Sequence, residues 1–324
     1  MSGRHEKEKQ IDTKVLEILK PMPEVLTNYY YSLTSAGKSY RTAKVYIEAV
    51  IRFIKYTFGE ECKDDFYLNV NVNHINRYVT SLRTKTVNGK IENTSDSYKT
   101  TNWSALNSFF QFLIPDYIKT NPVASTTRPK MRDNPTVTYL EKDEVSDIFK
   151  NVECTANPRF KNRDLCLVKL GFSTGLRISA ILQIDVSDLD LEHNQIKVNE
   201  KGDRDFVVMI GDNLKNQIEL WLKDRKNYFS DAKTDALFVS REKKRLSVQS
   251  ARDLLNKYSN GMTDKKVHPH VMRHSCATAL YEKTGDIYLC AKQLNHRNVS
   301  TTQRYAELSK DRQKKAANIL DDMF

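Results

Sequence analysis

The stretch HPHVMRHSCATALYEKTGDIYLCAKQLNHRNVSTTQRY, residues 268–305, decides how the rest of the chain is interpreted. It combines helical spacing of apolar residues with imidazole, guanidinium and phenol side chains, namely those of His270, Arg273, His274, His296 and Tyr305. A second arginine, Arg177, lies far upstream in the glycine-containing turn STGLRIS, residues 173–179. If these groups converge, they form a site for attack on a phosphate without a metal ion.

Attack on a phosphodiester places additional negative charge on the two non-bridging oxygens, and the planar fork of arginine matches these oxygens. A tyrosine can act as the nucleophile and conserve the bond energy in a phosphotyrosine, while an acid protonates the departing alkoxide. The chain offers a complete set of such groups. We expect Arg177 and Arg273 to bind the phosphate and Tyr305 to attack it, with proton transfer and donation by His270, His296 and Lys201.

A zinc site is the competing interpretation of the same helix. His270 and His274 stand at i and i+4, a spacing that can bind zinc, and His268 is nearby. The zinc-hydrolase pattern, however, has glutamate directly after the first histidine, where this chain has Val271. Arg273 would also repel a cation. The sequence therefore predicts no metal ligands and no cofactor.

The three segments TGLRIS, HPHVMRHSCAT and LNHRNVSTTQRY resemble the three boxes of the tyrosine recombinase family, which includes phage-type integrases and Xer-like site-specific recombinases and shares its chemistry with type IB topoisomerases. The second box of the family is H-x-x-R, here His270 to Arg273. The third box of the family has a histidine followed nine residues later by the nucleophilic tyrosine, and His296 and Tyr305 have the same spacing. A Lys-Gly on a β-hairpin turn of the family corresponds to Lys201-Gly202.

The resemblance implies a site-specific DNA recombinase or integrase that cleaves DNA through a 3′-phosphotyrosyl intermediate, without metal or ATP. It assigns phosphate binding to Arg177 and Arg273, general base assistance to His270, and nucleophilic attack to Tyr305. Lys201 protonates the 5′ oxygen, and His296 completes the phosphate's hydrogen bonds. Two alternatives remain open: DNA relaxation of the type IB topoisomerase kind, and a non-catalytic DNA-binding regulator on the same fold.

Two positions depart from the family pattern. Asn295 replaces the usual glycine before the third-box histidine, and we expect little cost if the backbone there is not at positive φ. Ala180 stands where the first box normally has an acidic residue, which puts the support of Arg177 in doubt but not the chemistry. His274 is left outside the expected catalytic set, as a supporting or structural residue.

The composition is that of an ordinary globular protein, with a hydrophobic content of 39% and a net charge of +11. Both halves of the chain carry an excess of basic residues, which suits a polyanion that is gripped from two sides. The five cysteines are scattered and form no C-x-x-C pair, so neither a disulfide framework nor a thiolate metal site is expected. No apolar run is long enough to span a bilayer, and no signal peptide is visible. We therefore expect a protein of the bacterial cytoplasm that is nucleoid-associated when bound to DNA.

Apolar periodicity predicts an all-helical first domain. A short charged helix at 5–20 precedes further helices that begin at Glu24 and at the N-cap Ser39, and others near 72–82 and 98–114. Residues 84–96 are polar and contain an Asn88-Gly89 turn signal, and we interpret them as a mobile loop.

The second domain is expected to be mainly helical with a small antiparallel sheet. Helices are predicted from about 140, at 165–172 and at 213–228, and from about 240 to the end of the chain. The expected strands are 189–191, 195–199, 205–210 and 236–239. The fold class is therefore a helical core-binding bundle followed by an α+β catalytic domain, and the family resemblance implies a C-shaped clamp on duplex DNA.

The expected division is an N-terminal extension at 1–20, a core-binding domain at 21–122, a basic linker at 123–137, a catalytic domain at 138–309 and a tail at 310–324. The proline-containing linker is equally consistent with a solvated tether and with a basic strap along a DNA backbone. A second basic run, REKKR, follows at 241–245. The candidate DNA-binding residues are Arg128, Lys130, Arg132, Arg241, Lys243, Lys244 and Arg245.

The ends of the chain suggest a simple recombinase that assembles on its core site. The first 20 or so residues are too few for an additional arm-binding domain. In the family, an apolar tail like that of residues 316–324 commonly docks onto a neighbouring subunit, so we expect a homotetramer on DNA and a monomer in free solution. Integration of a mobile element is favoured over resolution of chromosome dimers. The target DNA sequence and any accessory proteins cannot be read from the chain.

Overall fold

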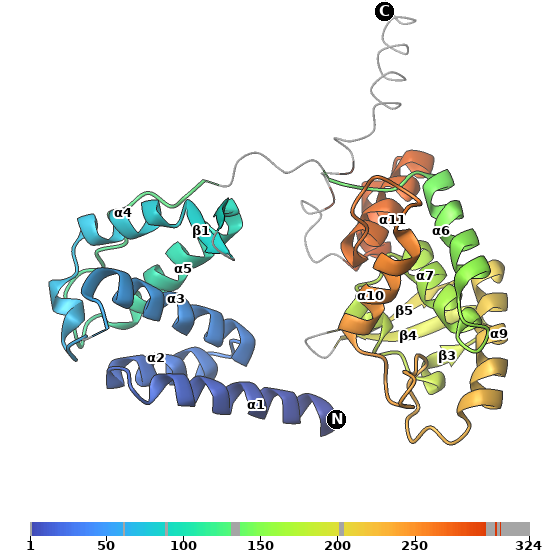
Figure 1. The fold of residues 1–324 in the computed structure, drawn as a ribbon, viewed down its shortest axis with the longest axis horizontal. Helices are drawn as coiled ribbons and strands as arrows, with labels where there is room; N and C mark the ends of the chain where they lie inside the picture. The colour runs from blue at the N-terminus through green and yellow to red at the C-terminus, as the bar shows by residue number, and fades with distance from the viewer. Residues whose placement is uncertain are drawn as a thin grey trace, which may run out of the picture. The chain divides into compact units, whose positions relative to one another are not determined.

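The structure is a computed structural model and describes residues 2–60, 62–87, 90–130, 137–200, 204–295, 302 and 305. The chain divides into two compact units, Met1–Pro135 and Thr136–Phe324 (Figure 1). We call them the first unit and the second unit.

The first unit is built from helices, as its apolar periodicity predicts. Ser39 caps the third helix as expected, since its side chain accepts a hydrogen bond from the backbone N–H of Thr42 at 3.2 Å. In the described residues the helices are α1 (Ser2–Leu19), α2 (Glu24–Ser35), α3 (Tyr40–Phe58), α4 (Val72–Ser81) and α5 (Asp96–Phe112), with a 3₁₀ turn at Phe66–Asn69.

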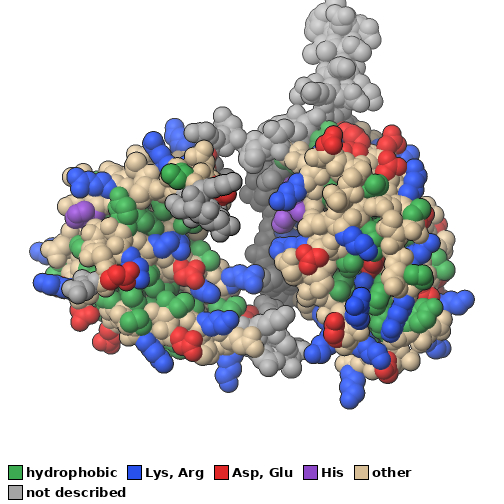
Figure 2. All heavy atoms as spheres, in the orientation of Figure 1, with side chains coloured by type: hydrophobic (Ala, Val, Ile, Leu, Met, Phe, Trp, Pro, Cys, Tyr) green, Lys and Arg blue, Asp and Glu red, His purple; other side chains and the backbone are tan. Residues whose placement is uncertain are grey.

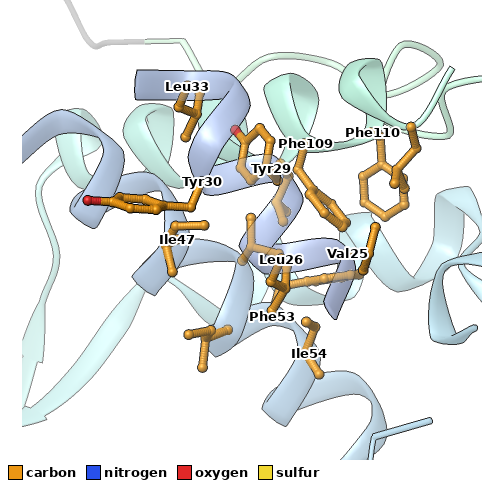
Figure 3. Packing of buried hydrophobic residues seen from close by; sticks show 14 of the residues in the cluster. Val25, Leu26, Tyr29, Tyr30, Leu33, Ile47, Phe53, Ile54, Phe109 and Phe110 are labelled. Atoms are coloured by element: carbon orange, nitrogen blue, oxygen red, sulfur yellow. The ribbon is translucent and has the colours of Figure 1, made fainter. Parts of the chain in front are cut away.

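The core of the first unit is formed by apolar side chains from α2, α3 and α5 that converge between the helices (Figure 3). Tyr29 and Phe109 meet edge to face with ring centroids 5.2 Å apart. The region expected as an extension contributes too, because Val15 and Leu19 of α1 are buried in the same cluster. Helix α1 is therefore part of the first unit's core.

The segment interpreted as a mobile loop contains a β-hairpin, so that interpretation was wrong. Strand β1 (Thr84–Val87) pairs antiparallel with β2 (Lys90–Asn93), and Val87 lies opposite Lys90. This register leaves Asn88-Gly89 as the connection, and this pair of residues is a strong hairpin signal between two short strands. The polar composition concealed the strands, and Ile91 of β2 is 77% exposed.

The start of the expected linker is packed against α5. Val123 is fully buried, Trp103 donates from Nε1 to Oγ1 of Thr126 at 2.8 Å, and Thr100 donates to the carbonyl of Pro129 at 3.3 Å. Residues 121–130 therefore belong physically to the first unit.

The second unit is mainly helical with one small sheet, as predicted. The helices of its described residues are α6 (Lys142–Thr155), α7 (Lys161–Thr174), α8 (Ile178–Ile181), α9 (Asp212–Phe229), α10 (Val248–Ser259), α11 (Pro269–Thr284) and α12 (Ile287–Gln293). A 3₁₀ turn at Val186–Asp188 precedes the strands β3 (Leu189–Asp190), β4 (Gln195–Glu200) and β5 (Arg204–Met209).

The sheet is antiparallel with strand order β3-β4-β5, and Glu200 pairs with Arg204 at the end of the β4–β5 hairpin. The predicted hairpin that carries Lys201 is therefore confirmed, although residues 201–203 lie outside the described residues. The strand expected at 236–239 was wrong, because only isolated bridges form there, from Asp185 to Ala236 and from Val239 to Arg245.

Helix α7 is the central element of the second unit and packs against α6, α9 and α11 (Figure 1). It carries a buried ion pair in which Arg163 donates to Asp164 and to the carbonyl of Val239, each at 2.8 Å. The other carboxylate oxygen of Asp164 accepts from the hydroxyl of Tyr258 on α10 at 2.7 Å. This network ties α7 to α10 with both charges satisfied.

The observed architecture confirms the predicted fold class of a mainly helical protein with a small antiparallel sheet. None of the helices in the described ranges combines the length and the apolar character that crossing a bilayer requires.

The buried ion pair gives a stability prediction. Asp164→Ala should lower the free energy of unfolding by about 3–5 kcal/mol, because it leaves the Arg163 charge buried and unpaired. Tyr258→Phe should cost about 2 kcal/mol, since it removes one hydrogen bond to a charged acceptor. Urea unfolding can be followed through buried Trp221 in a Trp103→Phe background, so that the signal reports the second unit alone.

The matched control is Asp147→Ala, which breaks a solvent-exposed pair with Lys150 and should change the free energy by less than about 1 kcal/mol. Equal effects of Asp164→Ala and Asp147→Ala would contradict a stabilising role for the network.

Candidate active site

The first box is a tight turn at the end of α7. Gly175 ends the helix in the left-handed conformation, with φ of +64°, which glycine adopts without a steric cost. A Cβ on Gly175 would also lie 2.6 Å from a methyl carbon of Leu294 and 3.1 Å from the sulfur of Cys276. Glycine is therefore required here both by the turn and by the close approach of α11 and α12.

Arg273 on α11 joins the boxes. Its side chain donates to the carbonyl of Gly175 at 2.9 Å and to the carbonyl of Leu294 at 2.7 Å, and the residue is only 4% exposed. These bonds connect the first-box turn, the second-box helix and the end of α12. They satisfy two buried backbone acceptors and fix the position of the guanidinium.

His270 lies one turn earlier on α11 and is exposed. Partial burial lowers the pKa of its imidazole below the ordinary value of 6.5, and the positive charges of Arg273, Arg177 and Arg252 lower it further. The two expected phosphate-binding arginines therefore act electrostatically on one imidazole. The neutral form that this environment favours can accept a proton. Arg252, an exposed residue of α10, was not in the predicted set.

Tyr305 packs against α11 at His274, one turn after His270 on the same side of the helix. Its hydroxyl is 2.9 Å from Nδ1 of His274, and its ring centroid is 5.8 Å from that of the imidazole. Tyr305 is only 1% exposed and packs with Ala277 and Leu294. The histidine that contacts the expected nucleophile is thus His274, which sequence reasoning had set aside. Its sequence signals are its position directly after Arg273 and its i, i+4 spacing from His270.

Three of the predicted site residues, Lys201, His296 and Arg132, lie outside the described residues. The structure brings together Arg177, His270 and Arg273, and it connects Tyr305 to the same helix through His274.

The zinc interpretation has no geometric support in the described part of the chain. No group of three or more His, Cys, Asp or Glu side chains there is arranged to hold a metal ion. His268 and His270 lie near each other, with ring centroids 6.1 Å apart, whereas His274 contacts Tyr305.

The basic candidates differ in how their side chains are engaged. Arg128 and Lys130 are exposed at the end of the segment that packs against α5, and Arg241 and Lys244 are exposed as well. Lys243, however, forms an ion pair with Asp231. Arg245 donates to the carbonyl of Leu182 at 2.8 Å and forms an ion pair with Asp185. Arg245 therefore anchors its loop to the core.

The two departures from the family pattern have different consequences. Ala180 is buried in the apolar core, so this position contributes packing. Asn295 has φ of +51°. We expected the replacement of glycine to cost little stability only if the backbone were not at positive φ, and this condition is not met. Asparagine tolerates the left-handed region better than most residues, which explains why the turn still forms.

Comparison with known proteins gives the family. The model of the phage integrase family matches residues 138–312, more than half of the chain, and the chain belongs to this family of tyrosine recombinases. It is an enzyme of site-specific recombination. Tyrosine recombinase XerC of Escherichia coli O157:H7 is 34% identical over 209 residues, which cover 63% of this chain and 67% of that protein.

Solved structures with the same fold include the XerH site-specific recombinase in a post-cleavage complex with palindromic difH substrate, with a TM-score of 0.68 and 21% identity over 87% of this chain and 80% of that one. A lambda integrase tetramer bound to a Holliday junction matches with a TM-score of 0.66 and 18% identity, covering 87% of this chain and 76% of that one.

The left-handed backbone at Asn295 predicts a ranking of variants. Asn295→Gly should unfold at the same urea concentration as the wild type or a higher one, because glycine adopts positive φ freely. Asn295→Val should lose about 1–2 kcal/mol, because a β-branched side chain collides with the backbone in this conformation. Lys292→Val, at an exposed helical position, is the control and should cost less than about 1 kcal/mol. Similar losses for the two valine variants would contradict the assignment of strain to Asn295.

The electrostatic grouping around His270 is testable by titration. The imidazole should titrate below pH 6.5, and Arg177→Gln should raise the midpoint while leaving it below 6.5, because burial is the larger cause. Arg177→Lys keeps the charge and should leave the midpoint nearly unchanged. NMR titration of the histidine ring resonances measures both. An identical midpoint in wild type and Arg177→Gln would show that Arg177 does not act on His270.

Proposed function

We propose that this enzyme cleaves and rejoins DNA at specific sites through a 3′-phosphotyrosyl intermediate formed by Tyr305, without metal or ATP. The observation that carries the proposal is the grouping of Arg177, Arg273 and His270, together with the placement of Tyr305 against the same helix. Two guanidinium groups supply the positive charge that a pentavalent phosphate needs.

In the first step the Tyr305 oxygen forms a bond to phosphorus and the bond from phosphorus to the 5′ oxygen breaks. His270 takes the phenolic proton, which its preference for the neutral form supports. Arg177 and Arg273 balance the charge on the non-bridging oxygens. In the second step a 5′-hydroxyl of a partner strand attacks the phosphotyrosine, and Tyr305 leaves with the proton returned.

Lys201 and His296 complete the proposal by family resemblance. Lys201 protonates the departing 5′ oxygen from the turn between β4 and β5, and His296 donates a hydrogen bond to the phosphate. Removing one such donor or acid typically lowers a rate by about 10²–10³-fold.

Duplex DNA is the partner that the charge distribution favours. The net charge is +11, and Lys and Arg side chains lie on both units on the face shown in Figure 2. We propose that the two units grip DNA as a C-shaped clamp, with exposed Arg128, Lys130, Arg241 and Lys244 among the phosphate contacts. Arg132 in the expected linker is part of the same proposal.

We further propose that the active assembly is a homotetramer on two recombination sites, formed from monomers and joined through the tail at 310–324. The lambda integrase tetramer on a Holliday junction, which shares this fold, supports the stoichiometry. The proposed setting is the cytoplasm, and the proposed substrates are the ends of a mobile element. An assay can distinguish integration from chromosome dimer resolution. It compares recombination between sites on separate DNA molecules with resolution of two sites on one molecule.

The reaction class predicts covalent capture. A nicked duplex suicide substrate carrying the recombination site should form a protein–DNA adduct that survives denaturing gel electrophoresis, because loss of the short 5′-hydroxyl strand prevents religation. Tyr305→Phe should abolish the adduct and retain DNA binding. Tyr288→Phe, at a tyrosine of α12 that is 73% exposed, is the matched control and should react like wild type.

Adduct formation without strand exchange between two sites would favour the topoisomerase alternative, which religates the same strand. Binding without any adduct would favour the non-catalytic regulator, and an adduct that persists in Tyr305→Phe would exclude Tyr305 as the nucleophile.

A further inference from the structure

Arg52, on α3 of the first unit, carries a charge that no carboxylate of the described residues pairs with. Neighbouring charged residues on α3 and α5 are paired, Lys44 with Glu48 and Lys99 with Asp96. Arg52 is only partly exposed, and a partly desolvated charge is costly without a partner. Its guanidinium is therefore suited to a ligand that brings its own acceptors.

Two contacts fix the plane of the Arg52 guanidinium. Its Nη2 donates to Oδ1 of Asn102 on α5 at 3.2 Å, and its central carbon lies 5.7 Å from the ring centroid of Tyr98, four residues earlier on the same helix. The Nε is buried without a hydrogen-bond partner in the part of the first unit that the structure describes, so a ligand can reach the group only at Nη1 and Nη2. Asn102 takes one of the two Nη2 hydrogens, which leaves one on Nη2 and both on Nη1.

Asn102 is itself held in place. It is 1% exposed, its Nδ2 donates to the carbonyl of Tyr98 at 2.8 Å, and its Oδ1 also accepts from the hydroxyl of Tyr78 on α4 at 3.1 Å. Burial raises the pKa of Tyr78 to about 12, although the positive charge of Arg52 opposes this, so the phenol stays protonated and continues to donate. The acceptor that orients Arg52 is therefore fixed by three helices, which reduces the entropy that Arg52 loses on binding a ligand.

Duplex DNA, the partner that the charge of the chain favours, offers suitable acceptors in two places. Phosphate oxygens lie along the backbone, and guanine presents N7 and O6 side by side in the major groove, which admits an α-helix. A phosphate contact tolerates a flexible side chain, because its energy comes mainly from charge. Two parallel hydrogen bonds to a base edge require a guanidinium held in one plane, as that of Arg52 is. The fixed plane therefore favours the guanine edge.

We propose that Arg52 reads one guanine of the recombination site through N7 and O6, and that Asn102, Tyr98 and Tyr78 are positioning residues that orient it. The proposal rests on the proposed grip of the two units on duplex DNA. It adds to that grip a residue that determines specificity and the base that this residue recognises.

The test measures base preference. A library of random duplexes, selected by binding to the wild-type protein, gives the preferred site, and each base pair of that site is then replaced in turn. In the wild type, replacing the G·C pair that Arg52 contacts should weaken binding about 5- to 150-fold. Arg52→Ala should bring this ratio close to one, while the preferences at all other positions stay the same. Because each ratio compares two duplexes on one protein preparation, a smaller folded fraction does not change it.

Arg41→Ala is the matched control, since it removes an exposed arginine of the same helix, and it should leave every base preference intact. Uniform weakening by Arg52→Ala on all duplexes would assign Arg52 to a phosphate and overturn the proposal, as would unchanged preferences. A wild-type protein that binds all duplexes alike would count against site-specific cleavage itself, whereas intact site selection with unchanged preferences in Arg52→Ala removes only the role of Arg52.

The role of Tyr98 has its own readout. Tyr98→Leu removes the ring beside the guanidinium and should lower the preference at the same base pair by about two- to fivefold, whereas Tyr98→Phe keeps the ring and should match the wild type. A purely structural role of Tyr98 would weaken binding to all duplexes alike. That result, or an unchanged preference in Tyr98→Leu, would exclude Tyr98 as a positioning residue.

Discussion

The second unit depends on one buried side chain, that of Arg273. Its two hydrogen bonds join backbone carbonyls at the ends of α7 and α12, which are far apart in the sequence. Without the guanidinium, two buried carbonyls would lose their donors, and the first-box turn would lose its connection to α11. The arginine that we propose to bind the phosphate therefore also connects distant parts of the backbone. Its geometry requires Gly175, because any side chain at that position would enter the space taken by Leu294 and Cys276.

Three consecutive residues of α11 each contact a different part of the second unit. Arg273 ties the boxes together, His274 contacts Tyr305, and Ser275 accepts from the backbone of Leu140 at the start of the second unit. Successive residues of a helix point in directions about 100° apart, so one turn can reach three different partners. This explains how a single helix supports the candidate site, the contact with Tyr305 and the entry of the chain into the unit.

The sequence predicted the features that depend on local spacing. The helices of the first unit, the N-cap at Ser39 and the β4–β5 hairpin were all visible as periodicity or turn chemistry. The hairpin at 84–93 was missed because its sequence is polar and carries no alternating apolar pattern. The strand at 236–239 was wrongly predicted because its apolar residues fill the core without forming a ladder. The bond from Arg245 to the carbonyl of Leu182 was not visible either, because a basic run shows charge but not the acceptors around it. The contact between His274 and Tyr305 joins residues that are distant in the sequence, and no local pattern contains it.

The structure separates two requirements that a DNA-cleaving enzyme must meet. The phosphate-binding groups have to be in place before the substrate arrives, because electrostatic stabilisation depends on preorganised charge. The bonds of Arg273 meet this need by fixing its guanidinium to backbone atoms, independently of Tyr305. The proposed nucleophile, Tyr305, comes from a later segment, and its contacts in the described residues include the hydrogen bond with His274 and packing against Ala277 and Leu294. The position of the proposed phosphate-binding arginine is therefore set by backbone atoms, whereas that of the proposed nucleophile is set by side-chain contacts.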